Sequence, residues 1–391
     1  MRSTNFFALA AGEPFRIFFP VGLLLGAIGV ALWPLFVWHA INFYPREAHL
    51  RLMIEGLMGS FIIGFLATAG PRLLNAQPFR ATETFSLVAL QLVSASFHFT
   101  QRRNLGDGVF LMTLVLFLSF VARRARTRQD LPPPNFVLVI LGLVNAIAGI
   151  ALMFTALNVT NGSGFLNQFG ALMLNEGFVL FPILGVGAFF FPKLLGGAKP
   201  QPADLNIAKS LWEKRAAIAA LTGLVIWISF VFEALERTRT AAIISGSAVL
   251  FYFALQGHLF EKPSGPPFLA HCFRFGVLLL VIALLFPVVL PTYRLANMHL
   301  AFIGGFSIIL FTVSTRVILG HSGHAHLFGR RLTFLAAALG LLVIAMIARV
   351  GADFFPPTRD SHLVYAALIW LIAAAVWAWA LLPKLLLSEE E

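Results

Sequence analysis

The stretch "EGLMGSFIIGFLATAGPR", residues 55–72, is an apolar run between an acidic residue and a basic one. A bilayer core about 30 Å thick needs roughly 20 helical residues, so this stretch and its neighbours predict a transmembrane helix. Two later stretches align with it without gaps: "EGFVLFPILGVGAFFFPK" at 176–193 and "HLAFIGGFSIILFTVSTR" at 299–316. Each copy begins with a polar or ionisable residue and reaches a basic residue 17 positions later. A pattern repeated at this distance indicates an architecture of repeated units.

The three copies are separated by 121 and 123 residues, the length of four membrane spans. The alternative is a chance match, since the chain contains 32 glycines and 41 phenylalanines. We favour the repeat because the polar residue and the basic residue recur together. The sequence then predicts one membrane domain, residues 1–391, built from three four-helix units at 14–128, 134–262 and 266–384.

The composition supports an all-α polytopic membrane protein. Hydrophobic residues make up 59% of the 391-residue chain and charged residues 12%, whereas soluble domains carry about 25% charged residues. The longest connection between apolar runs, at 193–210, divides the chain into six spans plus six. We expect twelve membrane helices, at 17–39, 48–70, 82–100, 105–122, 134–157, 167–191, 212–232, 240–260, 267–290, 294–319, 331–350 and 362–382.

The basic residues predict the orientation of the chain. Of the 28 Lys and Arg residues, 19 lie at the termini and in the even-numbered connections, and nine lie in the odd-numbered connections. Because basic residues collect on the cytoplasmic side, both termini are expected there. The net charge of +11 would suggest nucleic acid for a soluble protein, but here we expect a lipid bilayer and no nucleic acid. The start of the chain has no pattern of a removable signal peptide.

Five polar residues within the spans are candidates for cofactor binding. His49 and His299 lie near the outer ends of spans two and ten, and two imidazoles from facing helices can hold an iron porphyrin. The alternative is an interfacial histidine that simply reaches water. Glu55 and Glu176 suggest a proton path or a polar anchor, or else neutral carboxylic acids that tie helices together. Arg316 is expected to end its span at the inner headgroups.

The sequence "HSGHAH", residues 321–326, adds a cluster of histidines on the inner side. Together with Cys272, the only cysteine, His321, His324 and His326 would suit copper or zinc. Their spacings fit no closed zinc motif, and a wet loop at the headgroups is the favoured interpretation for His324 and His326. His321 is the better candidate of the three. A single cysteine excludes an internal disulfide framework.

Three stretches resemble the NnrS family of bacterial twelve-span membrane proteins. "FRIFFPVGLLLGAIGVALWPL" at 15–35 is similar to the family's opening "FRPFF" span, and "HLRLMIEGLMGSFIIGFLATAGPR" at 49–72 is similar to its "HAHEMLFGF…GFLLTAVP" span. The strongest match is "HLAFIGGFSIILFTVSTRVILGHSG" at 299–323, which resembles the family's "HALTVG…SRVSLGHTG" block. The resemblance runs nearly end to end. It implies a protein of the bacterial inner membrane that acts in the nitric-oxide response and contains haem and copper.

The resemblance also assigns roles to residues, with two departures. His299, Arg316 and His321 fall on motif positions, whereas the family's second histidine and its glutamate in "HAHEM" are replaced by Arg51 and Leu52. Three groups of four spans, with histidines on spans two and ten, are similar to the catalytic subunit of haem–copper oxidases, in which those histidines hold a haem. Spans six and seven contain no histidine here, so the conventional dinuclear site of those enzymes is absent.

Three functions are therefore expected, in order of preference. The first is a haem-binding membrane protein that protects against nitrosative stress by binding nitric oxide, by moving electrons from a donor or by aiding metal-centre repair. An enzyme that reduces nitric oxide is its stricter form and needs a second metal. The second function is a transporter or metal exporter without a redox cofactor. The third is a structural or assembly protein in which the histidines bind nothing.

Overall fold

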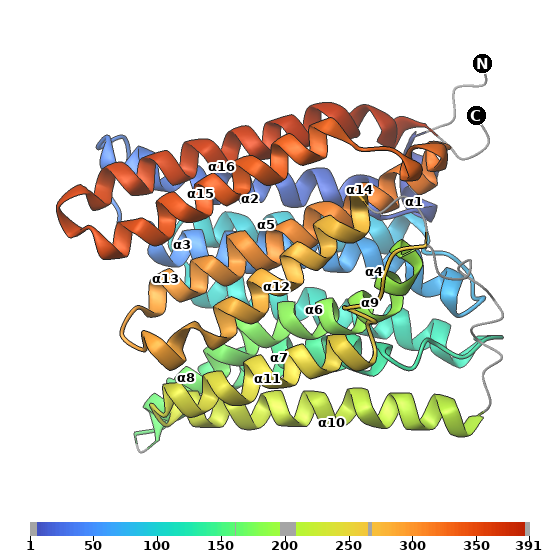
Figure 1. Ribbon diagram of the computed structural model, residues 1–391, viewed down its shortest axis with the longest axis horizontal. Coiled ribbons are helices and arrows are strands. Elements are labelled where there is room, and N and C mark those ends of the chain that lie inside the picture. The colour runs from blue at the N-terminus through green and yellow to red at the C-terminus, as the bar shows by residue number, and fades with distance from the viewer. Residues whose placement is uncertain (1–5, 161, 196–208, 265–267, 388–391) are drawn as a thin grey trace. The chain divides into compact units, whose positions relative to one another are not determined.

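The computed structural model describes residues 6–160, 162–195, 209–264 and 268–387, and every regular element in those ranges is a helix (Figure 1). This confirms the all-α prediction. Helices satisfy their own backbone hydrogen bonds, which is what a chain surrounded by lipid requires. Most of the predicted long connection at 193–210 lies outside the described residues.

Within the described residues, eleven helical segments are long and apolar enough to cross a membrane. They are Phe15–Val37, Arg46–Leu73, Arg103–Arg126, Phe136–Ala156, Ser163–Leu194, Lys209–Ala234, Thr238–Leu255, Phe268–Val289, Arg294–His321, Thr333–Phe354 and Pro356–Leu386. The predicted span 82–100 corresponds to α5 (Ala81–Phe99), which is not among the eleven. Its buried face carries Gln91, Ser94 and His98, which make it more polar than its neighbours. The structure thus confirms a polytopic membrane fold. The helix α5 lies where the twelfth span is predicted, but its most apolar stretch is less apolar than those of the other eleven.

Contacts within the chain define two compact units. The first unit comprises Met1–Pro132, Ser314–Leu327 and Trp370–Glu391, and the second comprises Pro133–Val313 and Phe328–Ile369. Three of the four boundaries fall inside helices, namely α14 (Ile308–His321), η5 (Ala325–Gly329) and α16 (Arg359–Leu381). The main part of the first unit covers the predicted repeat 14–128, and the threefold repeat itself stays a prediction.

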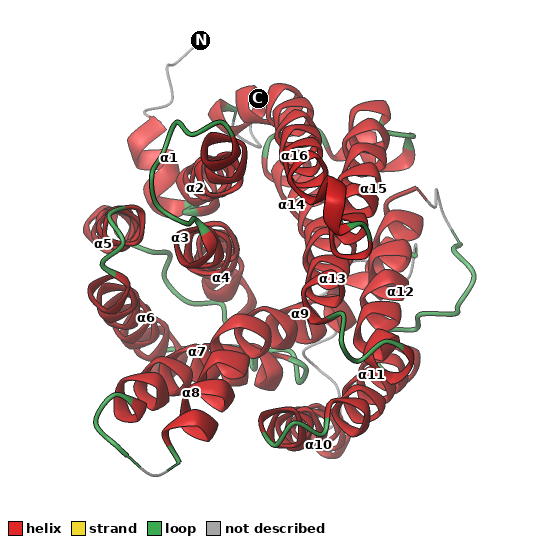
Figure 2. Ribbon diagram, turned by 90° about the vertical axis from the view of Figure 1, so that its left-hand side faces the viewer, coloured by secondary structure: helices red, strands yellow, loops and turns green. Residues whose placement is uncertain are grey.

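The first unit is built around α2, which packs on η1 and α4, and around the pair α5 and α6; Figure 2 shows these helices nearly end-on. Glycines bring α2 close to its neighbours, because a Cβ at Gly22 would lie 2.8 Å from Ser60 Cβ and one at Gly29 would lie 2.9 Å from Leu52 Cβ. The helices of this unit are α1 (Phe6–Gly12), α2 (Phe15–Val37), α3 (Arg46–Arg51), η1 (Leu52–Met58), α4 (Gly59–Leu73), α5, α6 (Arg103–Arg126) and η7 (Leu382–Leu386), with the ends of α14 and α16.

In the second unit, α7 packs on α9, α10 on α11, and α12 on both α11 and η4. A partly buried hydrogen bond joins α10 and α7, because the Trp227 indole donates to Asn145 Oδ1 at 2.7 Å. The helices of this unit are α7 (Phe136–Ala156), α8 (Ser163–Leu172), η2 (Met173–Gly177), α9 (Phe178–Leu194), α10 (Lys209–Ala234), α11 (Thr238–Leu255), α12 (Phe268–Val289), α13 (Arg294–His299), η4 (Leu300–Ser307), α15 (Thr333–Phe354) and η6 (Pro356–Thr358), with the first parts of α14 and α16.

Three of these elements, η1, η2 and η4, are π-helical segments of seven, five and eight residues. π-Helix accounts for well under 1% of residues in proteins and is frequent at functional sites. The three segments lie in the three spans that the sequence aligns, and Glu55 and Glu176 occupy the same place in η1 and η2. The irregularity thus recurs at the positions that the predicted repeat aligns, and the repeat stays a prediction.

Candidate functional site

His49 lies on the short helix α3, immediately before the π-helical segment η1. Its Nδ1 is 3.0 Å from the carbonyl oxygen of Gly29, and its ring packs edge-on against Trp33 with centroids 6.0 Å apart. A carbonyl can only accept, so this hydrogen bond places the proton on Nδ1. Nε2 then carries the lone pair, which is the usual arrangement in histidines that bind metals.

His299 also lies near a π-helical segment, at the end of α13 directly before η4, but its hydrogen bond is to its own helix, whereas that of His49 is to α2. The Nδ1 of His299 is 2.7 Å from the carbonyl oxygen of Leu295, so the same tautomer is selected. His49 belongs to the first unit and His299 to the second, and their pairing across one cofactor stays a prediction.

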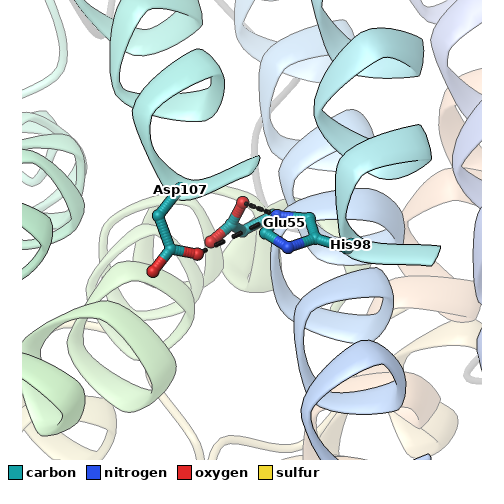
Figure 3. Close-up of side chains that lie close together, drawn as sticks. All are labelled: Glu55, His98 and Asp107. Carbon is teal, nitrogen blue, oxygen red and sulfur yellow. Dashed lines mark hydrogen bonds and ion pairs between the residues drawn. The ribbon is translucent and has the colours of Figure 1, made fainter. Parts of the chain in front are cut away.

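The best-defined cluster of ionisable groups consists of Glu55, His98 and Asp107, in the first unit (Figure 3). They come from η1, α5 and α6, and the side chain of each is 1% exposed. His98 Nε2 is 2.8 Å from Glu55 Oε2 and 3.9 Å from Asp107 Oδ1. Within the described part of the chain, this is the one group of three metal-ligating side chains whose donor atoms all lie within 4.8 Å of one another.

Two arginines form ion pairs with the carboxylates of this cluster. Arg51, one of the two departures from the family motif, is also 1% exposed, and its Nε lies 2.8 Å from Asp107 Oδ1 and 3.5 Å from Glu55 Oε1. Its second nitrogen, Nη2, donates to Asp107 Oδ2 at 3.1 Å. Arg103 is 3.5 Å from Asp107 Oδ2 but is 37% exposed. The cluster therefore contains one fully buried guanidinium between two buried carboxylates.

Polar groups on α5 and a glycine on α6 position the cluster. The Gln91 amide donates to the backbone carbonyl of Glu55, and the Ser94 hydroxyl lies 3.4 Å from Glu55 Oε2. A Cβ at Gly106 would overlap the His98 ring, so only glycine leaves room for the imidazole there. Sequence reasoning identified Glu55 but missed His98 and Asp107. His98 and Asp107 could have been found as ionisable residues inside apolar spans, because such residues are costly in a membrane and usually have a function.

Glu176, in η2, lines a cavity of the second unit. The cavity has a volume of about 60 Å³ and is lined also by Glu233, Arg294 and Asn297. Asn297 Oδ1 is buried and accepts no hydrogen bond from the described residues. Arg316 lies within α14, five positions before that helix ends at His321, and its place at the inner headgroups stays a prediction.

His321 is part of an ionic cluster at the end of α14. Its Nδ1 is 2.8 Å from Glu13 Oε1, and its Nε2 is 3.2 Å from Nη1 of Arg72, which also pairs with Glu13. Arg16 donates to the backbone carbonyl of His321 at 2.7 Å and to Glu13 Oε2 at 2.7 Å. Both ring nitrogens of His321 thus have protein partners, and a metal there would have to displace one of them.

The charge of Glu13 is strongly stabilised in this cluster. Burial alone would raise the pKa of Glu13, but the hydrogen bond from His321 and the surrounding cations outweigh burial and lower the pKa from 4.5 to about 2. His321, Arg16 and Arg72 hold Glu13 as a carboxylate at every physiological pH. The geometry is that of an ionic clasp rather than of an open metal site.

The remaining histidines of "HSGHAH" lie in and beside the short helix η5 (Ala325–Gly329). His324 Nδ1 is 2.6 Å from the carbonyl of Ser322, and the rings of His324 and His326 are stacked with centroids 5.9 Å apart. Cys272 is half-buried on α12, which belongs to the second unit, whereas His324 and His326 belong to the first. A shared copper site of these residues stays a prediction.

Comparison with known proteins identifies the family. No curated protein matches the chain. The family model described as NnrS protein matches residues 10–388, which is nearly the whole sequence. That span includes every membrane helix and every candidate residue described above. The chain therefore belongs to the NnrS protein family.

Proposed function

We propose that this chain is an integral membrane haem protein, or a haem and copper protein, that acts in the nitric-oxide response or in nitric-oxide detoxification. The match to the NnrS family over residues 10–388 carries the proposal, because family membership supports a membrane protein of that response. The eleven apolar helices support residence in a bilayer. The distribution of basic residues supports the bacterial inner membrane with both termini in the cytoplasm.

The local geometry of His49 and His299 supports them as the axial ligands of the haem. Each directs Nδ1 at a backbone carbonyl, at 3.0 and 2.7 Å, so Nε2 is the nitrogen of each ring that would bind an iron. A haem held by both histidines would supply an iron centre that passes electrons, and binding of nitric oxide would require one of the two histidines to leave the iron. Glu55 in the span of His49, Arg316 in the span of His299 and Glu176 in a third span are proposed as supporting polar groups.

Copper is the finer part of the proposal. His321, with its two neighbours His324 and His326 and with Cys272, provides imidazole and thiol ligands of the kind that copper prefers. The partners of His321 in the ionic cluster argue that copper binds there only after Glu13 or Arg72 has moved.

The test is the reduced-minus-oxidised absorption spectrum of the purified protein, with haem and copper quantified on the same sample. The wild-type chain should hold about one haem with sharp reduced bands. His49→Ala and His299→Ala should each abolish those bands, because each removes one of two axial ligands.

The matched control is the pair His324→Ala and His326→Ala, which should leave the haem spectrum unchanged. Size-exclusion elution at the wild-type volume would show that each variant is folded. Full retention of haem in both single variants would remove His49 and His299 from the proposal. A colourless wild-type protein from cells supplied with haem would remove the haem itself.

A transporter without a redox cofactor is the second candidate, and the cavity at Glu176 favours it. A carboxylate within a π-helical segment, with Glu233 and Arg294 on the same cavity wall, resembles the charged, irregular sites of transporters. At about 60 Å³ the cavity has room for water or a small ion and not for a metabolite. Ion flux in proteoliposomes that is lost in Glu176→Gln would support this function.

A further inference from the structure

The buried cluster in the first unit has the composition and spacing of a metal site. Glu55, His98 and Asp107 offer one imidazole nitrogen and carboxylate oxygens, a mixed set that suits Zn²⁺, Co²⁺, Ni²⁺ or Cu²⁺. Ligands about 2.1 Å from a tetrahedral ion lie roughly 3.4 Å from one another. The observed separations of 2.8 and 3.9 Å from His98 Nε2 bracket that value.

Two of the oxygens in this cluster lack hydrogen bonds. Glu55 Oε1 and Asp107 Oδ1 are buried and accept no hydrogen bond from any described residue. Such oxygens are rare in protein interiors because leaving them unsatisfied is unfavourable. Arg51 Nε lies 3.5 Å from the first and 2.8 Å from the second, so a cation satisfies them by charge rather than by directed hydrogen bonds.

The balance of charge in this cluster determines whether Arg51 or a divalent metal ion lies beside the two carboxylates. With both carboxyl groups ionised and His98 neutral, the cluster carries a charge of −2, and Arg51 cancels half of it. His98 Nε2 donates to Glu55 Oε2 at 2.8 Å, so this nitrogen must release its proton when a metal ion binds. A divalent ion added beside Arg51 would leave a buried excess of positive charge next to a guanidinium, which is strongly unfavourable. A divalent ion without Arg51 would cancel both carboxylates. Arg103 does not change this result, because its 37% exposure lets solvent screen its charge.

We propose that Glu55, His98 and Asp107 form the ligand set of a divalent transition-metal site that Arg51 keeps closed by taking the place of the cation. Arg51 and the metal are mutually exclusive occupants. The wild-type chain therefore holds no metal at this position, and loss of the guanidinium opens the site. The proposal goes beyond the proposed function, because nothing in it depends on haem.

The experiment is equilibrium dialysis of full-length protein in detergent against Zn²⁺, with bound metal quantified by mass spectrometry. The purification tag should contain no histidine. Arg51→Ala and Arg51→His should each bind one additional Zn²⁺ per chain, at least about 100-fold more tightly than the wild type does at this position. X-ray absorption at the zinc edge should show nitrogen and oxygen neighbours and no sulfur.

Three controls isolate the site. Arg51→Lys keeps a positive charge and should stay closed, and Arg103→Ala should stay closed because Arg51 remains. Adding Asp107→Asn to Arg51→Ala should remove the extra zinc, which distinguishes this site from the histidines of "HSGHAH". Haem content is measured separately, so failure of the haem proposal leaves the zinc result unaffected.

Two results would overturn the proposal. One is a folded Arg51→Ala protein that binds no more zinc than the wild type. The other is a wild-type protein whose bound zinc disappears in Asp107→Asn, since Arg51 would then not exclude the metal. If neither Arg51 variant folds in metal-free medium, growth with added zinc should restore folding, because the ion replaces the lost charge. Failure of that rescue also contradicts the proposal.

Discussion

Glu13 illustrates how single residues stabilise this protein at the end of its helices. It lies just before α2 and accepts from Arg16 at 2.7 Å and from His321 at 2.8 Å. Arg16 also donates to the carbonyls of Leu385 and Leu387, both at 2.7 Å. One carboxylate and one guanidinium thus connect the start of the first unit with its last described residues.

We predict a stability difference that depends on pH for Glu13→Gln. The folded-state pKa of about 2 lies below the ordinary value of 4.5, so the carboxylate stabilises the fold above pH 4.5. That stabilisation is lost as the pH falls from 4.5 to about 2. At pH 7 the variant should be less stable by about 2 kcal/mol, the value typical of hydrogen bonds between charged groups. Thermal unfolding in detergent at pH 7 and at pH 3 measures this difference.

The gap between variant and wild type should be smaller at pH 3 than at pH 7. An equal gap at both values would mean that Glu13 acts through packing rather than through its charge. Glu47→Gln is a suitable control, because the side chain of Glu47 is 46% exposed and pairs with Arg103 at 3.6 Å on the surface. Exposed pairs contribute about 0–1 kcal/mol, so this variant should be close to wild type.

At the scale of single elements, the π-helical segment η1 changes what a helix can bind. A π turn leaves backbone carbonyls without the usual partner four residues on, and here the Gln91 amide donates to the carbonyl of Glu55. The same segment directs the Glu55 side chain toward α5 and α6. The periodicity of an apolar run predicts its helical length but carries no signal for one extra residue per turn.

The close packing of α5 against α6 leads to a second prediction. In Gly106→Ala the new Cβ would overlap the His98 ring, so the ring should leave Glu55 and the thermal midpoint should fall. Overpacking of this kind destabilises by about 1–3 kcal/mol. The matched control is Gly340→Ala on α15, where a Cβ would meet nothing within 4 Å.

Gly340→Ala should be neutral or more stable by up to about 1 kcal/mol, because alanine favours the helix over glycine. Differential scanning fluorimetry of both variants in the same detergent compares them directly. If Gly106→Ala unfolded at or above the wild-type temperature, α5 and α6 would have to separate more readily than their packing indicates.

On the scale of the whole molecule, the orientation in the bilayer rests on the basic residues, and it can be measured with cysteine labelling. Cys272 is the only cysteine, so Cys272→Ser provides a background without thiols. Asn42 and Thr292 are exposed in connections predicted to face outward, and Thr127 and Ala325 are exposed in connections predicted to face inward.

We predict that a membrane-impermeant maleimide labels Asn42→Cys and Thr292→Cys in spheroplasts, and labels Thr127→Cys and Ala325→Cys only after lysis. The physical reason is that translocation leaves the connections rich in Lys and Arg in the cytoplasm. The reverse labelling pattern would mean that both termini face outward. If the two positions of one pair were labelled from opposite sides of the membrane, the predicted number of spans between them would be wrong.

The sequence by itself determined the class of fold. Apolar runs of about 20 residues must become helices in a bilayer, because lipid offers no hydrogen bonds to an open backbone. The predicted spans therefore agree with the long helices to within a few residues at most ends, as at 134–157 against Phe136–Ala156. The motifs around His299 also sufficed to identify the family that the match over residues 10–388 confirms.

Only the tertiary structure decided the candidate site. Glu55 is 43 residues from His98 and 52 from Asp107 in the sequence, and η1, α5 and α6 must pack together before the three side chains meet. Arg51 appeared in the sequence only as a departure from a motif. Its role follows from lying 2.8 Å from a buried carboxylate, because charges removed from water must find a partner, and which partner is near depends on how the helices pack.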